Sequence, residues 1–245
     1  MSTSAWRTTS SSGSASWGID SVDIQVYLDH LLGALTDTFG DRLLYVGLQG
    51  SYLRGEATET SDIDVMIIFD EIDAPTLDTY RDLLIAVGDY DRSCGFVCSR
   101  ADMAAWNTPE VCHLLHTTRD LYGRLADFVP AYSREDVIQY VKMSIGNLYH
   151  ELCHRYIHAS RKENQTHLAM TCKAVFFILQ NIHYLRTGNF TSTKRELLEA
   201  LDGDDRAILE LSLRLARGES CDFDSAFSRL LQWCQSSLTE WNRGE

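Results

Sequence analysis

Two aspartates, Asp62 and Asp64, stand two positions apart at the start of an apolar run from Val65 to Phe69. Because side chains alternate along a strand, both carboxylates point to the same face, with Cα atoms about 7 Å apart. Two acids on one side are costly in free energy unless a metal or hydrogen bonds balance their charge. Carboxylate oxygens are the ligands that hard divalent cations prefer. The pair indicates a cation site, although Asp-x-Asp alone also fits a solvated strand entry.

A Gly-Ser pair follows an earlier apolar run. Leu43 to Leu48 is predicted to be a short buried strand, and Gly50 and Ser51 come just after it. Glycine permits close approach of the backbone, and free N–H groups at the start of a helix bind anions. Gly-Ser alone fits any tight turn. The order of strand, Gly-Ser, Asp-x-Asp and strand favours a triphosphate site beside the metal that bridges its phosphates.

The segments from Gly50 to Ala57 and from Ser61 to Val65 resemble the motif of the DNA polymerase β-like nucleotidyltransferase superfamily. Within it, the pattern is most similar to the antibiotic-modifying and minimal nucleotidyltransferases. The resemblance implies that Asp62 and Asp64 bind Mg²⁺ and act in catalysis. It further implies that the nucleotide is held by residues of the same motif, namely Gly50, Ser51, Arg54 and Ser61. The motif is not a Walker A loop, because no Gly-Lys-Ser/Thr follows.

A second resemblance lies in the other half of the chain. The stretches from Ala174 to Tyr184 and from Thr187 to Lys194 are similar to the C-terminal domain of aminoglycoside 3″-adenylyltransferases. In that family, a basic residue early in the helix and a lysine after the Thr-Gly turn reach the phosphates. The resemblance therefore implies nucleotide contacts for Lys173 and Lys194. Each lysine also fits a solvated surface charge.

The third strand departs from the family pattern. Family members usually place a third carboxylate there, as metal ligand or general base, but the stretch from Gly95 to Cys98 has no acid. Asp89 and Asp91 lie just before it, and Asp91 is the first choice for the missing group. Glu151, in the helical half, is the second choice.

Glu151 stands beside a row of basic side chains. Helical spacing places four residues on one face: His150, His154, His158 and Arg161. This row either lines the cleft opposite the metal site, with Glu151 as base, or lies on the surface or between helices. Cys112, His113 and His116 suggest another metal site, but no fourth ligand is evident. A partly buried amphipathic helix is the favoured interpretation there.

Particular elements must position these residues. Apolar periodicity predicts two helices, Asp23 to Phe39 and Pro75 to Val87, with Gly40 ending the first. It also predicts three strands: Leu43 to Leu48, Ile63 to Phe69, and Gly95 to Cys98. This order indicates an α/β (α+β) domain over residues 19–130. The resemblance implies that it is a nucleotidyltransferase domain with a short mixed sheet.

Residues 131–245 show only helical periodicity, interrupted at Lys162–Gln165, Gly188 and Gly203. We expect an all-α helical bundle that contributes substrate and nucleotide contacts. Its helices begin with capping signatures, Ser133 with Asp136 and Thr193 with Glu196. Residues 1–18 are mostly Ser, Thr, Ala and Gly, so we expect a disordered tail.

Composition restricts the partners. The net charge of −13 disfavours a long nucleic acid and would attract a cationic small molecule. The seven cysteines include no Cys-x-x-Cys and suggest reduced thiols. No apolar run approaches the ~20 residues of a membrane helix, and no charged-then-apolar secretory start is present. We expect a cytoplasmic protein that does not associate with a membrane.

The functional hypothesis is a Mg²⁺-dependent, adenylyltransferase-like nucleotidyltransferase. It would move an NMP, with AMP preferred, from ATP or another NTP to a hydroxyl of a small acceptor. An aminoglycoside-like antibiotic fits the acidic charge, and antibiotic resistance would follow. One alternative is a non-catalytic nucleotide-binding or antitoxin-like protein. Another is an enzyme that nucleotidylates a protein or tRNA. The acceptor, the preferred base and the oligomeric state stay open.

Overall fold

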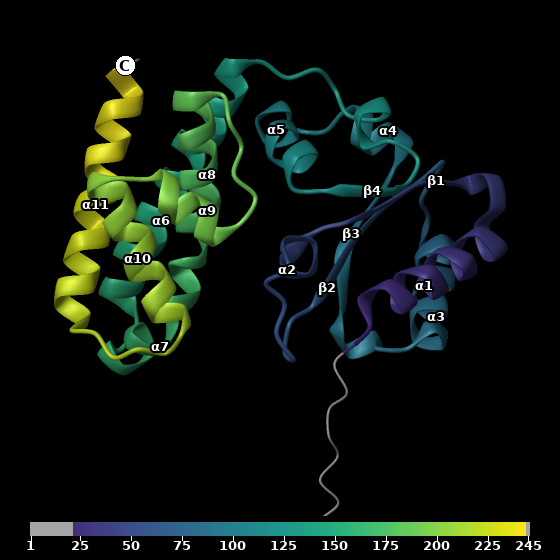
Figure 1. The fold of residues 1–245 in the computed structure, drawn as a ribbon, viewed down its shortest axis with the longest axis horizontal. Helices are drawn as coiled ribbons and strands as arrows, with labels where there is room; N and C mark the ends of the chain where they lie inside the picture. The colour runs from purple at the N-terminus through teal and green to yellow at the C-terminus, as the bar shows by residue number, and fades with distance from the viewer. Residues whose placement is uncertain (1–21, 244–245) are drawn as a thin grey trace, which may run out of the picture.

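The structure, a computed structural model, describes residues 22–243. The tail predicted at residues 1–18 lies outside them. The described chain forms a sheet domain followed by a helical domain that lies beside it (Figure 1). The boundary predicted at residue 130 falls in the connection between the last short helix of the sheet domain and the first long helix of the bundle.

Four strands form one sheet in the order β3-β2-β1-β4. Their bounds are β1 (Leu43–Leu48), β2 (Ile63–Phe69), β3 (Ser93–Ser99) and β4 (Arg119–Tyr122). The central strand β2 runs antiparallel to β1 and parallel to β3, and β4 pairs antiparallel with the other edge of β1. The predicted short mixed sheet is confirmed. The strand β4 has no apolar run that could predict it, because its four residues are mostly polar.

Helices surround the sheet at several points. They are α1 (Ile24–Phe39), α2 (Gly50–Arg54), α3 (Ala74–Val87), α4 (Arg100–Ala104) and α5 (Thr108–His116), with 3-10 turns η1 (Gly40–Arg42), η2 (Tyr90–Arg92) and η3 (Leu125–Asp127). The two predicted helices are confirmed as α1 and α3. Asp23 accepts hydrogen bonds from the first N–H groups of α1, and Gly40, at φ 52°, ends that helix. Asp73 caps α3 in the same way.

Each face of the sheet has its own core. Ile63, Val65 and alternate residues beyond them on β2 pack under α1 and α3. The intervening residues Met66 and Ile68 pack on the opposite face, which η3 and α4 cover. By the same alternation, Asp62 and Asp64 belong to that second face. Figure 1 shows α1 and α3 on the side remote from the helical domain and α2 on the side toward it.

The second domain contains six helices within residues 22–243. They are α6 (Arg134–His158), α7 (Arg161–Thr171), α8 (Lys173–Thr187), α9 (Lys194–Ala200), α10 (Gly203–Ala216) and α11 (Phe223–Arg243). Their apolar faces share one core, which confirms the predicted bundle. The capping boxes predicted at Ser133 and Thr193 are confirmed. The predicted interruption at Lys162–Gln165 is wrong, because a third capping box at Ser160 starts α7 before those residues.

One stretch of the described chain, Arg161–Thr187, is long and apolar enough to cross a membrane by length and composition alone. Its longest uninterrupted apolar run, Ala174 to Leu179, is far shorter than the ~20 residues of a membrane helix. In the structure it comprises α7 and α8, with a turn at Cys172 between them. Half of its most apolar window is buried, and Val175, Ile178 and their neighbours belong to the bundle core.

The strand β3 requires a glycine at its centre. Gly95 lies opposite Val65 in the parallel register, and a Cβ at Gly95 would stand 2.0 Å from the Val65 carbonyl oxygen. We expect Gly95→Ala to lower the free energy of unfolding by roughly 1–3 kcal/mol, because two backbones must separate. Urea denaturation measures this. Gly33→Ala in α1, where nothing lies within 4 Å, is the control and should stabilise by about 0.5–1 kcal/mol. Equal midpoints for the two variants would contradict the tight register.

Candidate functional site

The Gly-Ser turn and the Asp-x-Asp pair meet at one point. The Gln49 N–H donates to the Asp64 carbonyl at 2.8 Å, so the chain entering α2 is fixed to β2. Gly50 then adopts a positive φ of 69° at the first position of α2. A Cβ at Gly50 would lie 1.8 Å from the Asp64 Oδ2 atom. Glycine is therefore required here both for its backbone conformation and for the space that the carboxylate fills.

The charge around Asp64 is unbalanced. Burial raises the pKa of Asp64, and the nearby Asp62 carboxylate raises it further. A hydrogen bond from the Cys94 thiol and the Arg54 charge act in the opposite direction without cancelling the shift. A bound cation would relieve both the burial cost and the repulsion. The aspartate pair therefore fits a hard divalent cation in both donor chemistry and charge.

The described residues offer such a cation few protein ligands. No group of three His, Cys, Asp or Glu side chains within residues 22–243 is arranged to hold a metal. Mg²⁺ does not need one, because it is usually held by one or two carboxylates together with water and the phosphates of a substrate. Asp62 and Asp64 therefore suit a metal that arrives with a nucleotide better than a permanently bound structural ion.

The loop between α2 and β2 is held by contacts that no local motif signals. Arg92, in η2, donates to the Ser61 carbonyl at 3.2 Å and also to the Tyr52 hydroxyl. The Ser61 hydroxyl in turn accepts from the Thr58 N–H at 2.8 Å. Ser61, predicted as a nucleotide ligand, thus also closes the turn that leads to Asp62. Arg92 could not be predicted as a site residue, because a lone arginine before a strand carries no distinguishing pattern.

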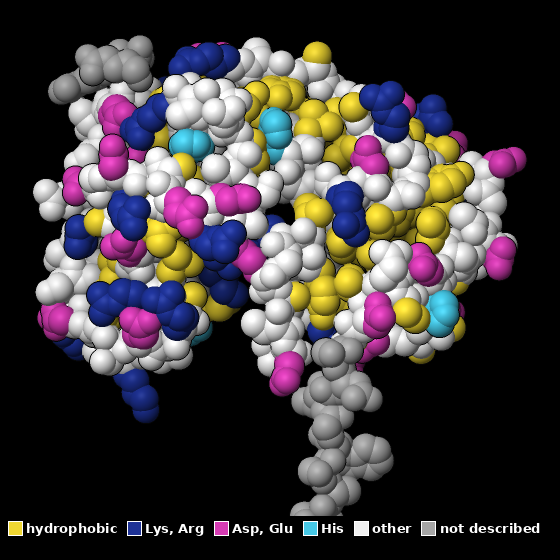
Figure 2. Space-filling view, in the orientation of Figure 1, with side chains coloured by type: hydrophobic (Ala, Val, Ile, Leu, Met, Phe, Trp, Pro, Cys, Tyr) yellow, Lys and Arg dark blue, Asp and Glu magenta, His cyan; other side chains and the backbone are white. Residues whose placement is uncertain are grey.

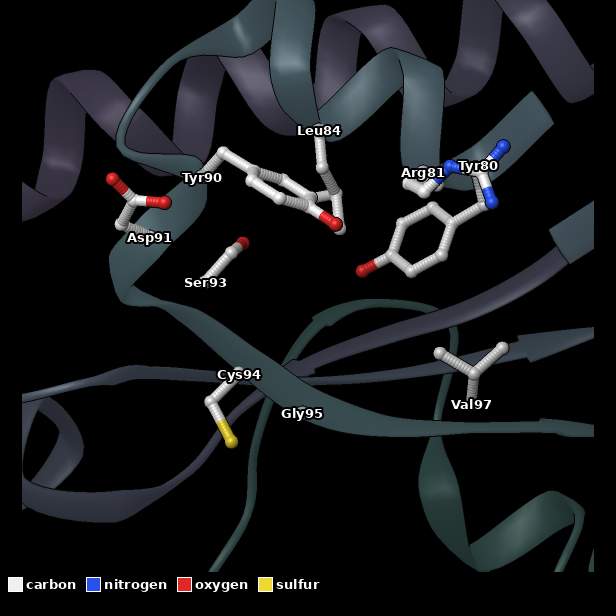
Figure 3. A pocket seen from close by; sticks show the side chains of 9 residues that line it. All are labelled: Tyr80, Arg81, Leu84, Tyr90, Asp91, Ser93, Cys94, Gly95 and Val97. Carbon is white, nitrogen blue, oxygen red and sulfur yellow. The ribbon is translucent and has the colours of Figure 1, made fainter. Parts of the chain in front are cut away.

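The third strand places a thiol, and no carboxylate, beside Asp64. In the parallel register Cys94 is the partner of Asp64, so both side chains lie on one face. Asp91, the predicted third carboxylate, lines a groove of about 440 Å³ beside β3, together with Tyr90 and Ser93. Cys94 also borders this groove, but Figure 3 shows its side chain on the opposite side of β3 from Tyr90 and Ser93. The structure therefore separates Asp91 from the face that carries Asp64.

Basic side chains approach the turn from both domains. Arg54, at the end of α2, lies 5.6 Å from the ring centroid of Phe176 on α8. Lys194, at the start of α9, lies 5.9 Å from the same ring. Both also pair with the Glu56 carboxylate. Arg54 and Lys194, predicted from separate motifs, therefore stand together where the two domains meet, and Figure 2 shows a hollow bordered by charged side chains between the two lobes.

The remaining predicted residues lie elsewhere on the bundle. Lys173 is exposed in the first turn of α8. Glu151 pairs with Arg155 on its own helix at 2.5 Å. The histidine row on α6 is exposed, with ring centroids 5.9 Å apart for His150 and His154. These contacts favour the surface interpretation of the row over a cleft that faces Asp64.

His113 joins the domains by packing. Its ring stacks on Tyr140 of α6 at 5.5 Å and meets Phe177 of α8 edge-on at 5.4 Å. Its Nδ1 atom lies 3.2 Å from the Asn181 side-chain amide nitrogen. Burial lowers the pKa of His113 to about 4, and the Arg54 charge contributes. These contacts support the packed-helix interpretation of the cluster formed by Cys112, His113 and His116.

A pH titration tests this placement. His113 stays neutral in the fold, whereas an unfolded histidine gains a proton near pH 6.5. Stability should therefore fall as the pH drops from 6.5 toward about 4, and level off below the folded pKa. Between pH 6.5 and about 4, the free energy of unfolding should fall by roughly 1–3 kcal/mol less in His113→Gln than in the wild type. Urea midpoints at several pH values measure it; identical pH dependence in both proteins would contradict a buried neutral His113.

Comparison with known proteins adds a family match. A family model described as a nucleotidyltransferase domain matches residues 28–87, which contain both the Gly50–Ser51 turn and the Asp62–Asp64 pair. A curated protein of Methanocaldococcus jannaschii, whose name assigns it protein adenylyltransferase activity, is 51% identical over 39 residues. That alignment covers 16% of this chain and 39% of the relative. The chain therefore spans about two fifths of the length of this curated relative.

Two solved structures show weaker likeness. A spectinomycin adenyltransferase from Enterococcus faecialis, with ATP and spectinomycin, gives a TM-score of 0.49 at 14% identity, covering 83% of this chain and 98% of that chain. A toxin-antitoxin with AMP-PNP gives a TM-score of 0.30 at 21% identity, covering 52% of this chain and 91% of that one. Because both TM-scores are low, the functional argument rests on the family match and the site geometry.

Proposed function

We propose that this chain, whose residues 28–87 are a nucleotidyltransferase domain, transfers a nucleoside monophosphate from an NTP to a hydroxyl group. The observation that carries the proposal is the contact between Gly50 and the Asp64 carboxylate. It places a backbone turn suited to phosphate beside two acids suited to a cation. ATP is the proposed donor, supported by the adenylyltransferase name of the curated relative.

The geometry suggests how the chain would bind the nucleotide. The N–H groups at the start of α2 and the Ser51 hydroxyl would donate to phosphate oxygens. Arg54 and Lys194 would balance the triphosphate charge from the two sides of the domain junction. Asp62 and Asp64 would hold Mg²⁺, which when bound polarises the phosphate and aligns the attacking and leaving oxygens. Together these groups would orient the α-phosphorus for in-line attack.

The acceptor would enter from the hollow between the domains, where small-molecule sites commonly form. The net charge of −13 favours a cationic acceptor such as an aminoglycoside-like compound. A protein hydroxyl is the second candidate, favoured by the name of the curated relative. We propose that the reaction takes place in the cytoplasm, and that an antibiotic acceptor would make the chain a resistance determinant.

A nucleotide-binding role without catalysis is favoured by one observation. The position opposite Asp64 on β3 is Cys94, so this strand supplies no third acid to the face of Asp64. An antitoxin-like or sensor protein needs the phosphate turn and the cation pair but no proton acceptor. The protein is incubated with each labelled NTP and a panel of aminoglycosides, lincosamides and proteins, and pyrophosphate release is measured. This measurement distinguishes the catalytic role from the non-catalytic one. Binding without release on any acceptor would favour the non-catalytic role.

The aspartate pair gives the direct test of the cation site. We expect Asp62→Asn and Asp64→Asn to lose metal-dependent binding of a non-hydrolysable ATP analogue while keeping the wild-type melting temperature. Calorimetry with and without Mg²⁺ measures this. Asp70→Asn is the matched control, because Asp70 lies just beyond the other end of β2 and pairs with Arg42 at the surface. Unchanged affinity and metal dependence in both site variants would remove the metal assignment.

Asp91 and Glu151, the predicted general bases, can be tested in the pyrophosphate-release assay. A general base typically contributes 10²–10⁴-fold to the rate. Because Asp91 faces the groove beside β3 and Glu151 is paired with Arg155, we expect Asp91→Asn and Glu151→Gln to retain most turnover on an identified acceptor. A loss of roughly 10²-fold or more in either variant would restore that residue as the base.

A further inference from the structure

Glu56 joins the phosphate turn to the helical domain. Its carboxylate accepts from the Arg54 Nε atom at 3.0 Å and from the Lys194 backbone N–H at 2.8 Å. The Lys194 Nζ atom lies 3.2 Å from the same carboxylate. Glu56 and Lys194 are 138 positions apart in the chain, so this contact connects the two domains directly.

This ion cluster is partly shielded from water. The exposed fractions of the side chains are 20% for Glu56, 13% for Arg54 and 40% for Lys194. The ring of Phe176, itself buried, lies beneath both cations. Charge pairs at such a site interact more strongly than pairs at an open surface. Although burial alone would raise the pKa of Glu56, the contacts with Lys194 and Arg54 hold it below its usual range.

The same two cations are the ones that the proposed function assigns to the triphosphate. Glu56 lies two residues beyond α2, so its negative charge stands near the phosphates that the turn would hold. Lys194 cannot give its full charge to both the Glu56 carboxylate and a phosphate. A bound NTP must therefore compete with Glu56 for Lys194.

We propose that Glu56 is an affinity-setting residue of the nucleotide site: it pairs with Lys194 in the empty protein, and the NTP phosphates displace it. This inference rests on the proposed function. It gives Glu56 two effects with separate readouts. In the empty protein, the Glu56–Lys194 pair stabilises the contact between the domains. On nucleotide binding, breaking that pair costs affinity.

Glu56→Gln isolates the charge. The glutamine carbonyl still accepts from the Lys194 N–H, so the start of α9 stays anchored while the competition for Nζ is removed. With Mg²⁺ and a non-hydrolysable ATP analogue, we expect Glu56→Gln to bind about 3- to 30-fold more tightly than the wild type. Glu59→Gln, an exposed position on the same loop, is the charge-matched control and should change affinity much less.

A double-mutant cycle completes the test. Lys194→Met should weaken binding, and the gain from Glu56→Gln should disappear in the Lys194→Met background. Equal or weaker binding by Glu56→Gln, with the wild type binding normally, would overturn the inference and leave the proposed function standing. A gain that persists without Lys194 would also overturn it, because the effect would then come from the release of Arg54 or from general repulsion. Failure of the wild type itself to bind the analogue would instead refute the proposed function.

Discussion

The site depends on the close contact between the backbone turn at Gln49 and Gly50 and the strand β2 at Asp64. The Gln49 N–H bonds to the Asp64 carbonyl, and Gly50 leaves no side chain between the turn and the Asp64 carboxylate. A side chain at position 50 would push the turn away from β2 and separate the group suited to phosphate from the group suited to a cation. The parallel pairing of β2 with β3 is equally close at Gly95. Two glycines thus allow three segments of backbone to converge.

The helical domain extends this arrangement from the other side. The aromatic packing of His113 holds one end of the domain junction, and the cluster of Arg54, Glu56 and Lys194 holds the part beside α2. The first contact is apolar and neutral, whereas the second is ionic. The ionic contact is the one that we propose exchanges partners with a phosphate, while the apolar contact keeps the domains together.

Features that depend on local pattern could be predicted from the sequence. The strands β1 and β2 follow from uninterrupted apolar runs, and the capping boxes at Ser133 and Thr193 follow from short-range spacing. Features that depend on tertiary register could not. Pairing of β3 with β2 determines that Cys94 faces Asp64, and no local pattern encodes that register.

The same limit explains the residues missed at the site. Arg92 and Glu56 each act on segments that folding alone brings near them, across 31 and 138 positions respectively. Lys194 could be named from a family resemblance, but its carboxylate partner could not. The strand β4 is short and polar, and it exists because β1 offers a free edge. Motifs therefore located the candidate site, and tertiary contacts supplied its supporting residues.

Transfer of a nucleoside monophosphate breaks the bond between the α-phosphorus and pyrophosphate, so the position of a label in the products tests it most directly. ATP labelled at the α-phosphorus and ATP labelled at the γ-phosphorus are incubated separately with the protein, Mg²⁺ and each acceptor of the panel. We predict that α-label appears on the acceptor and γ-label appears only in pyrophosphate. Transfer of γ-label to the acceptor, or release of γ-label as inorganic phosphate alone, would contradict it.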